Sequence, residues 1–207
     1  PDLFDFRYIA SYFLISSSIT ELTFSGDTRF GREIQKLISR GQLSNYLIKP
    51  VNMLRFIFAN FAGTRMSVWC FSLISLIFGI LVKPPTSIYG VLLFPISMVL
   101  TALAGYSVNI LIACVGFYSP EAGSVRNVYE HVRRILSGAL IPLSYFPPAF
   151  KSFARASPFP VLLYIPTQIL QNGDLNYETF TYLGLSLFWT IVLMICLNLW
   201  AVEDSNL

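Results

Sequence analysis

LSGALIPLSYFPPAF, residues 136–150, is the stretch that decides how this chain folds. It begins with the apolar residues of a membrane helix and then meets Pro142, Pro147 and Pro148, with aromatic residues between them. Proline inside a helix removes a backbone donor and clashes with the preceding turn, so the helix must end here. Because the sequence stays apolar afterwards, we expect the chain to turn back within an apolar environment.

The composition of the 207 residues places the chain in a membrane. Hydrophobic residues make up 55% of it and charged residues 12%, whereas a soluble domain has about 25% charged residues. Several apolar runs approach the ~20 residues with which a helix crosses a bilayer. We therefore expect an all-α polytopic membrane protein, with residues 1–207 forming a single transmembrane domain. The net charge of +3 is too small and too dispersed to indicate a nucleic-acid partner.

Five apolar segments are candidate membrane helices: residues 4–24, 66–82, part of 84–120, 125–145 and 179–202. As one helix, the third stretch would measure ~55 Å against a hydrocarbon core of ~30 Å. It is therefore either one crossing with extended ends or a helix broken near Pro95 or Gly105. Since the chain opens at Pro1, already close to an apolar run, we also expect that an N-terminal membrane helix is missing.

The positive charges orient these segments. Seven Lys and Arg residues lie between the first and second segments, but only Lys83 lies between the second and third. Cytoplasmic connections carry an excess of Lys and Arg. This bias predicts that residues 24–65 form a cytoplasmic connection and that the short turn after residue 82 is external.

Residues 156–173 carry no acidic or basic side chain and are long enough to span a membrane. Three prolines interrupt them, however, and backbone groups freed at membrane depth must find partners in protein or water. We expect an external re-entrant segment over residues 144–177, with two short helices that dip in from the outer face before the last membrane helix. The alternative is one kinked spanning helix, which would place Asn172 in the cytoplasm.

A cationic stripe marks the cytoplasmic connection. Arg32, Lys36 and Arg40 recur every four residues beside apolar positions, which predicts an amphipathic helix. Two roles remain open for it. The helix could lie on anionic lipid with its charges among the head groups, or it could dock into another protein.

Catalytic chemistry finds little support in the sequence. The single histidine, His131, has no cysteine or second histidine near it, and no phosphate loop of the form G-x-x-x-x-G-K-S/T is present. Glu21 is the one carboxylate near membrane depth; such an acid is a functional candidate, although it can also lie at the cytoplasmic interface. We predict no catalytic, cofactor-binding or metal-ligating residue and expect that the chain is not an enzyme.

Two stretches carry a family resemblance. ISRGQLSNYLIKPV, residues 38–51, is similar to a G-x-L-x-x-x-L-x-x-P element, and residues 136–173 contain a G-x-x-x-P, F-P, P-F and Y-x-P series followed by glycine. In this order they resemble the membrane subunits of type-2 ABC exporters, the ABC-2-type bacterial permeases whose ATPase is a separate chain. The resemblance covers nearly the whole sequence.

The resemblance implies six membrane helices per subunit and a working unit in the cytoplasmic (inner) membrane. Two permease subunits, identical or homologous, would work with two ABC ATPase subunits that carry ATP and Mg. It also favours docking for the amphipathic helix, as a coupling helix that receives motion from the ATPase. The implied ATPase contacts are Arg32, Lys36, Arg40, Gly41, Gln42, Leu43 and Tyr46.

The implied substrate path lies between the two permease subunits, with the re-entrant segment as an outer gate. Its weakly polar lining suits a lipidic, amphipathic or drug-like substrate better than a sugar or an ion. A channel or structural membrane assembly protein without ATPase coupling is the alternative. The predicted path and gate residues are Ser16, Ser17, Thr20, Tyr106, Asn109, Gly138, Pro142, Phe146, Pro147, Pro158, Phe159 and Pro166.

Overall fold

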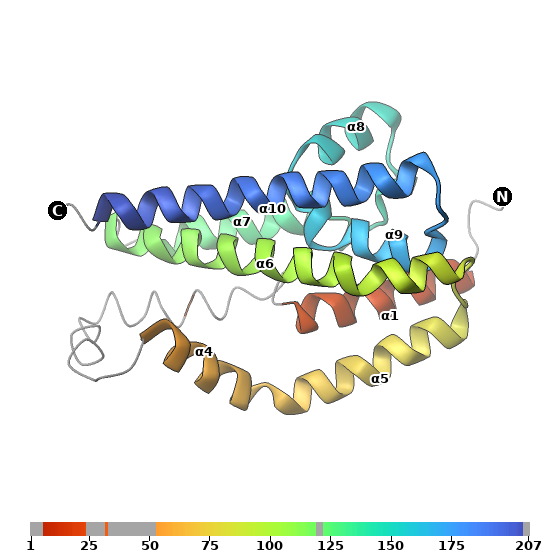
Figure 1. Cartoon of the computed structure of the whole chain (residues 1–207), viewed down its shortest axis with the longest axis horizontal. Helices are drawn as coiled ribbons and strands as arrows, with labels where there is room; N and C mark the ends of the chain where they lie inside the picture. The colour runs from red at the N-terminus through yellow and green to blue at the C-terminus, as the bar shows by residue number, and fades with distance from the viewer. Residues whose placement is uncertain (1–5, 24–31, 33–52, 119–121, 205–207) are drawn as a thin grey trace.

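The computed structural model describes residues 6–23, 32, 53–118 and 122–204, and the elements within these ranges are all helical (Figure 1). The all-α prediction is therefore confirmed for this part of the chain. The α-helices are α1 (Phe6–Leu22), α4 (Met53–Thr64), α5 (Met66–Val82), α6 (Ile88–Tyr118), α7 (Ala122–Leu136), α8 (Pro148–Ala156), α9 (Tyr164–Asn172) and α10 (Tyr177–Asp204). Two short 3₁₀ helices, η1 (Leu143–Tyr145) and η2 (Phe159–Leu162), flank α8.

Two described helices are long and apolar enough to cross a membrane, over Ile88–Val115 in α6 and Tyr177–Trp200 in α10. They pack together, and Thr190 Oγ1 donates a hydrogen bond to the carbonyl of Leu100 at 3.2 Å. α5 is a shorter apolar helix of 17 residues. Large apolar side chains stand exposed on all three helices, as a surface in contact with lipid requires.

α6 runs without a break through Pro95 and Gly105. The long apolar stretch is therefore one helix, which settles the alternative that the sequence left open. Its 31 residues correspond to ~46 Å, so the helix is longer than a hydrocarbon core of ~30 Å.

α1 and α5 form an antiparallel pair joined by serine hydroxyls. Ser11 Oγ donates to the carbonyl of Gly79 at 2.8 Å, and Ser75 Oγ donates to that of Leu14 at 3.2 Å. α4 precedes α5 and was not predicted from the sequence, which foresaw only the amphipathic helix in this connection. Apart from Arg32, that amphipathic helix lies outside the described residues.

α7 ends at Leu136, earlier than the predicted segment 125–145. The cause is Gly138, whose φ of 82° lies in the left-handed region that glycine adopts without steric cost. Its N–H donates to the carbonyl of Ile135, and that of Leu140 donates to the carbonyl of Arg134, both at 3.4 Å. These bonds satisfy carbonyls that a helix end leaves free.

α9 is the central element of the fold and contacts α1, α6 and α10 (Figure 1). Every residue from 160 to 171 is buried. Pro166 lies in the first turn of α9, where its missing N–H costs no intrahelical hydrogen bond. The nine residues of α9 span only ~14 Å, too little to cross a bilayer alone.

The C-terminal end of α9 lies beside the turn between α5 and α6. The backbone N–H and Oγ1 of Thr86 both donate to the carbonyl of Gln171, at 3.1 and 3.0 Å. Gln171 Nε2 in turn donates to Ser11 Oγ at 2.9 Å, which ties α9 to α1. The loop from α9 to α10 is therefore at the same end of the bundle as the α5–α6 turn.

Candidate functional site

A cavity of about 400 Å³ lies between α1 and the C-terminal end of α7. One wall comes from α1, through Phe13, Ser16, Ser17, Thr20 and Glu21. The rest of the lining comes from the end of α7 and from two later segments: Arg133, Arg134, Ala139, Leu140 and Leu163. The cavity thus combines charged, hydroxyl and apolar groups within an otherwise apolar bundle.

The hydroxyl groups of the α1 wall bond to their own helix. Ser16 Oγ donates to the carbonyl of Phe13 at 3.2 Å, and Thr20 Oγ1 donates to the carbonyl of Ser16 at 2.8 Å. Ser17 Oγ donates to the carbonyl of Leu14 at 3.0 Å. Such bonds let hydroxyl groups stand in an apolar helix without leaving a donor unsatisfied.

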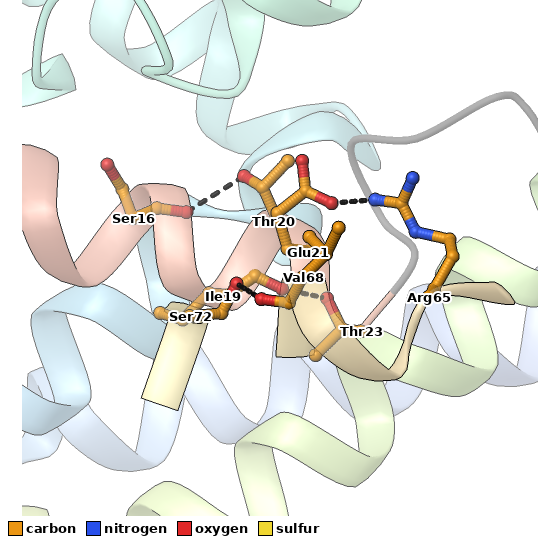
Figure 2. A network of polar contacts seen from close by, with 8 residues as sticks. All are labelled: Ser16, Ile19, Thr20, Glu21, Thr23, Arg65, Val68 and Ser72. Atoms are coloured by element: carbon orange, nitrogen blue, oxygen red, sulfur yellow. Dashed lines mark hydrogen bonds and ion pairs between the residues drawn. The ribbon is translucent and has the colours of Figure 1, made fainter. Parts of the chain in front are cut away.

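The end of α1 carries an ion pair. Arg65, between α4 and α5, donates from Nη2 to Glu21 Oε2 (Figure 2). The Arg65 side chain is 6% exposed and that of Glu21 is 30% exposed. Glu21 is therefore a partner of a buried guanidinium as well as part of the cavity wall. Beside the pair, Thr23 Oγ1 donates to the carbonyl of Ile19 at 2.6 Å.

Arg133 and Arg134 supply the positive charge of the cavity. Both lie in the last turn of α7, where cations interact favourably with the helix dipole. Arg133 is buried and Arg134 is exposed. Sequence reasoning missed them as site residues because it used their charge only to orient the segment.

A buried tyrosine joins α1 to the end of α7 near the cavity. The side chain of Tyr12 is fully buried, and its hydroxyl donates to the carbonyl of Gly138 at 2.8 Å. This bond holds the turn that carries the cavity residues Ala139 and Leu140.

We expect Tyr12→Phe to lower the free energy of unfolding by about 1 kcal/mol, because the buried carbonyl of Gly138 loses its donor while the ring remains. Denaturation of the purified protein in detergent measures this. Tyr177→Phe is the matched control, since Tyr177 is 86% exposed. Equal stability of the two variants would contradict the role assigned to Tyr12.

The structure does not gather all the predicted path residues in one place. Ser16, Ser17 and Thr20 share the cavity, whereas Tyr106 and Asn109 of α6 do not line it. Asn109 is buried, and its Nδ2 donates to the carbonyl of Gly105 at 2.9 Å.

The remaining predicted gate residues surround η1, α8, η2 and α9. Pro158 and Phe159 line a second cavity, apolar and about 340 Å³ in volume, where the ring centroid of Phe159 is 6.0 Å from that of Tyr129. Phe146 stacks on Phe150 with centroids 4.6 Å apart. The other members lie at turns or in the core: Gly138, Pro142, Pro147 and Pro166.

Most predicted ATPase contacts fall outside the described residues: Lys36, Arg40, Gly41, Gln42, Leu43 and Tyr46. Arg32 is described, and its Nη2 lies 3.8 Å from Glu130 Oε1 of α7. Within the described ranges, no group of three His, Cys, Asp or Glu side chains could hold a metal ion.

The sequence model of a family described as "ABC-2 family transporter protein" matches residues 4–202. No curated protein matches the chain.

Proposed function

Because the chain belongs to the ABC-2 family of transporter proteins, we propose that it is the permease subunit of an ATP-driven ABC transporter in the cytoplasmic membrane. It would export or flip a lipidic, amphipathic or drug-like substrate, together with a second permease subunit and two ABC ATPase subunits that bind ATP and Mg. The observation that carries the proposal is the cavity, which places Ser16, Ser17 and Thr20 beside two arginines in an apolar bundle. Binding of a water-soluble cargo would not require the apolar walls of the cavity. Simple contact between the helices and the surrounding lipid would not require the two arginines.

The proposed topology has five crossings: α1, α5, α6, α7 with the residues that follow it, and α10. Residues 24–65 are then cytoplasmic, and the α5–α6 turn is external, in line with the distribution of Lys and Arg. The bonds between Thr86 and Gln171 support an external start for α10, because both residues lie at the same end of the bundle.

Residues 144–177 form the proposed re-entrant gate. Arg155, in the last turn of α8, donates to Tyr182 Oη at 2.7 Å, near the start of α10. Further along, the carbonyl of Val161 accepts from Thr101 Oγ1 at 2.8 Å, close to the middle of α6. From there α9 leads back to the level of Thr86. These contacts support a segment that enters to mid-depth from the outer side and returns.

Coupling to the ATPase would reach the cavity through α7. Arg32 of the proposed coupling segment lies beside Glu130, and Glu130 precedes Arg133 and Arg134 by about one helical turn. Because both side chains are partly exposed, the ion pair contributes less than ~1 kcal/mol to stability. It therefore brings the two segments into contact without fixing them to each other. Rigid-body movement of the coupling segment would shift α7 and, with it, one wall of the cavity.

Purification from the native membrane tests the proposal. We expect the tagged chain, extracted in mild detergent, to bring down an ABC ATPase and to show ATP hydrolysis that disappears when the ATPase is removed. Absence of an ATPase, together with ATP-independent ion conductance in planar bilayers, would instead favour the alternative of a channel.

Labelling of single cysteines tests the topology. We expect an impermeant maleimide added to intact cells to modify Thr86→Cys and Asn172→Cys, since both positions are exposed at the end proposed to be external. Gln42→Cys should react only after the membrane is opened. If position 172 also needed an opened membrane, residues 144–177 would cross the bilayer and the re-entrant gate would be wrong.

A further inference from the structure

The proposed re-entrant gate, residues 144–177, contains two helices that are held very differently. Nearly all of α9 is buried. Its side chains bond to α1, because Gln171 Nε2 donates to Ser11 Oγ and Gln168 Nε2 donates to Tyr8 Oη, at 2.9 and 2.8 Å. α9 is therefore fixed to the bundle both by burial and by hydrogen bonds.

α8 is held by fewer contacts. It packs on η1 and η2, the short helices that flank it in the chain, and it projects from the side of the bundle (Figure 1). Of its nine described residues, only Ala154 is buried, and the side chain of Phe153 is 65% exposed. Phe150 packs against the core but is itself only partly buried. Apolar burial thus stabilises the position of α8 much less than that of α9.

A hydrogen bond between side chains joins α8 to α10. Arg155 Nη2 donates to Tyr182 Oη at 2.7 Å, and the centre of the guanidinium lies 5.5 Å from the centroid of the Tyr182 ring. The Tyr182 ring packs edge-on against that of Tyr164, with centroids 6.3 Å apart. Because Tyr164 belongs to the core and is 2% exposed, Tyr182 is a well-fixed acceptor. The bond therefore ties the last turn of α8 to the rigid part of the bundle.

Proline residues interrupt the backbone at both ends of α8. Pro147 and Pro148 stand at its start, and at its other end Ser157 has extended backbone and is followed by Pro158. Proline has no N–H, so a helical hydrogen-bond ladder does not continue across either joint. A rotation at these two joints would move α8 as a rigid unit without breaking the ladder of a neighbouring helix.

We propose that α8 is a hinged lid on the outer side of the bundle, held closed by the bond between Arg155 and Tyr182, while α9 stays in place. Opening turns α8 about its two proline joints and uncovers Ala154. Since Pro158 lines the apolar cavity of about 340 Å³, the same turn moves one wall of that cavity. The proposal rests on the function proposed above and names the part of the gate that moves.

Thiol labelling of the purified chain in detergent tests the lid, with the three native cysteines replaced by serine. Ala154→Cys reports on α8 and Thr167→Cys reports on α9, because both positions are fully buried in the closed state. A buried thiol reacts with maleimide only from the open population. We expect Arg155→Gln to raise the labelling rate at position 154 about tenfold, the effect of one charged hydrogen bond, and to leave the rate at position 167 unchanged.

Lys151→Gln is the matched control, because it removes a positive charge from the same helix one turn earlier. It should leave the rate at position 154 unchanged. Tyr182→Phe should act as Arg155→Gln does, since it removes the acceptor and keeps the ring. The two changes together should raise the rate no further than either alone, because both remove the same bond.

Four results would each overturn the lid: an unchanged rate at position 154 in Arg155→Gln, an equal effect of Lys151→Gln, additive effects of Arg155→Gln and Tyr182→Phe, or a parallel rise at position 167. The measurement requires neither ATP nor a partner. A closed α8 in a chain that brings down an ABC ATPase therefore refutes this inference alone. An opening lid in a chain without an ATPase partner contradicts the proposed function alone.

Discussion

Gly173→Val is expected to destabilise the protein by about 3 kcal/mol, at the upper end of the range for over-packing. A Cβ at this position would meet the carbonyl oxygen of Ile169 and lie 2.9 Å from Cα of Gly90. Both obstacles are backbone, so no side chain can rotate out of the way. The end of α9 would have to leave α6, and with it the bonds between Gln171 and Thr86.

The comparison is Gly184→Val in α10, where an added Cβ meets nothing within 4 Å. Thermal unfolding of both variants in detergent, followed by size-exclusion chromatography, measures the difference. We expect Gly184→Val to behave as the parent protein does. Gly173→Val with the same unfolding temperature would show that α9 does not dock against α6 as described.

Glu21→Gln is expected to lower the free energy of unfolding by about 2 kcal/mol. Removing one member of a fully buried ion pair costs about 3–5 kcal/mol, because the remaining charge keeps its desolvation penalty. Arg65 is buried, but Glu21 is 30% exposed, so water weakens the pair and the lower figure applies.

Two further variants sharpen this result. Glu178→Gln, at an exposed acid in the first turn of α10, should change stability little. The double change Glu21→Leu with Arg65→Met should recover most of the loss, because it removes both charges and keeps apolar volume. If Glu21→Gln cost no more than Glu178→Gln in chemical denaturation, the pair would not hold α1 to α5.

The features that the sequence predicted are those with a local signal. Uninterrupted apolar runs mark α5, whose bounds coincide with the predicted 66–82, and α10, which begins two residues before the predicted 179–202. The end of α7 was missed because an apolar sequence continues past it. The left-handed Gly138, and not a change of composition, ends that helix.

The burial of α9 could not be predicted from its sequence alone. Its polar residues find partners far away along the chain: Gln168 Nε2 donates to Tyr8 Oη at 2.8 Å, and Gln171 bonds to Ser11. Two glutamines in an apolar stretch indicate that partners exist but not where they lie. Only the packing of α1 against α9 shows that these partners are Tyr8 and Ser11.

The sequence singled out residues of only one wall of this cavity. Ser16, Ser17 and Thr20 stood out as hydroxyl residues in an apolar helix, and the structure places all three in one cavity. Arg133 and Arg134 lie more than a hundred residues away, and nothing in the local pattern connects them to α1. A charged residue that orients a membrane helix can also line a cavity. The spacing of such residues in the sequence does not distinguish the two roles.

The most direct test of ATP-driven movement at the cavity uses a cysteine as a reporter. With Cys70, Cys114 and Cys196 replaced by serine, Ser17→Cys places one thiol on the cavity wall. Its maleimide labelling rate is measured in the complex with the ATPase, with and without ATP. Thr181→Cys, exposed on α10 and away from the cavity, is the control.

We expect ATP to change the labelling rate at position 17 severalfold and to leave the rate at position 181 unchanged, because in the proposed mechanism closure of the ATPase dimer would move α7 relative to α1. The change should be absent with an ATPase variant that cannot bind ATP. An ATPase-containing complex in which ATP leaves the labelling rate at position 17 unaltered would contradict the proposed role of this cavity in transport.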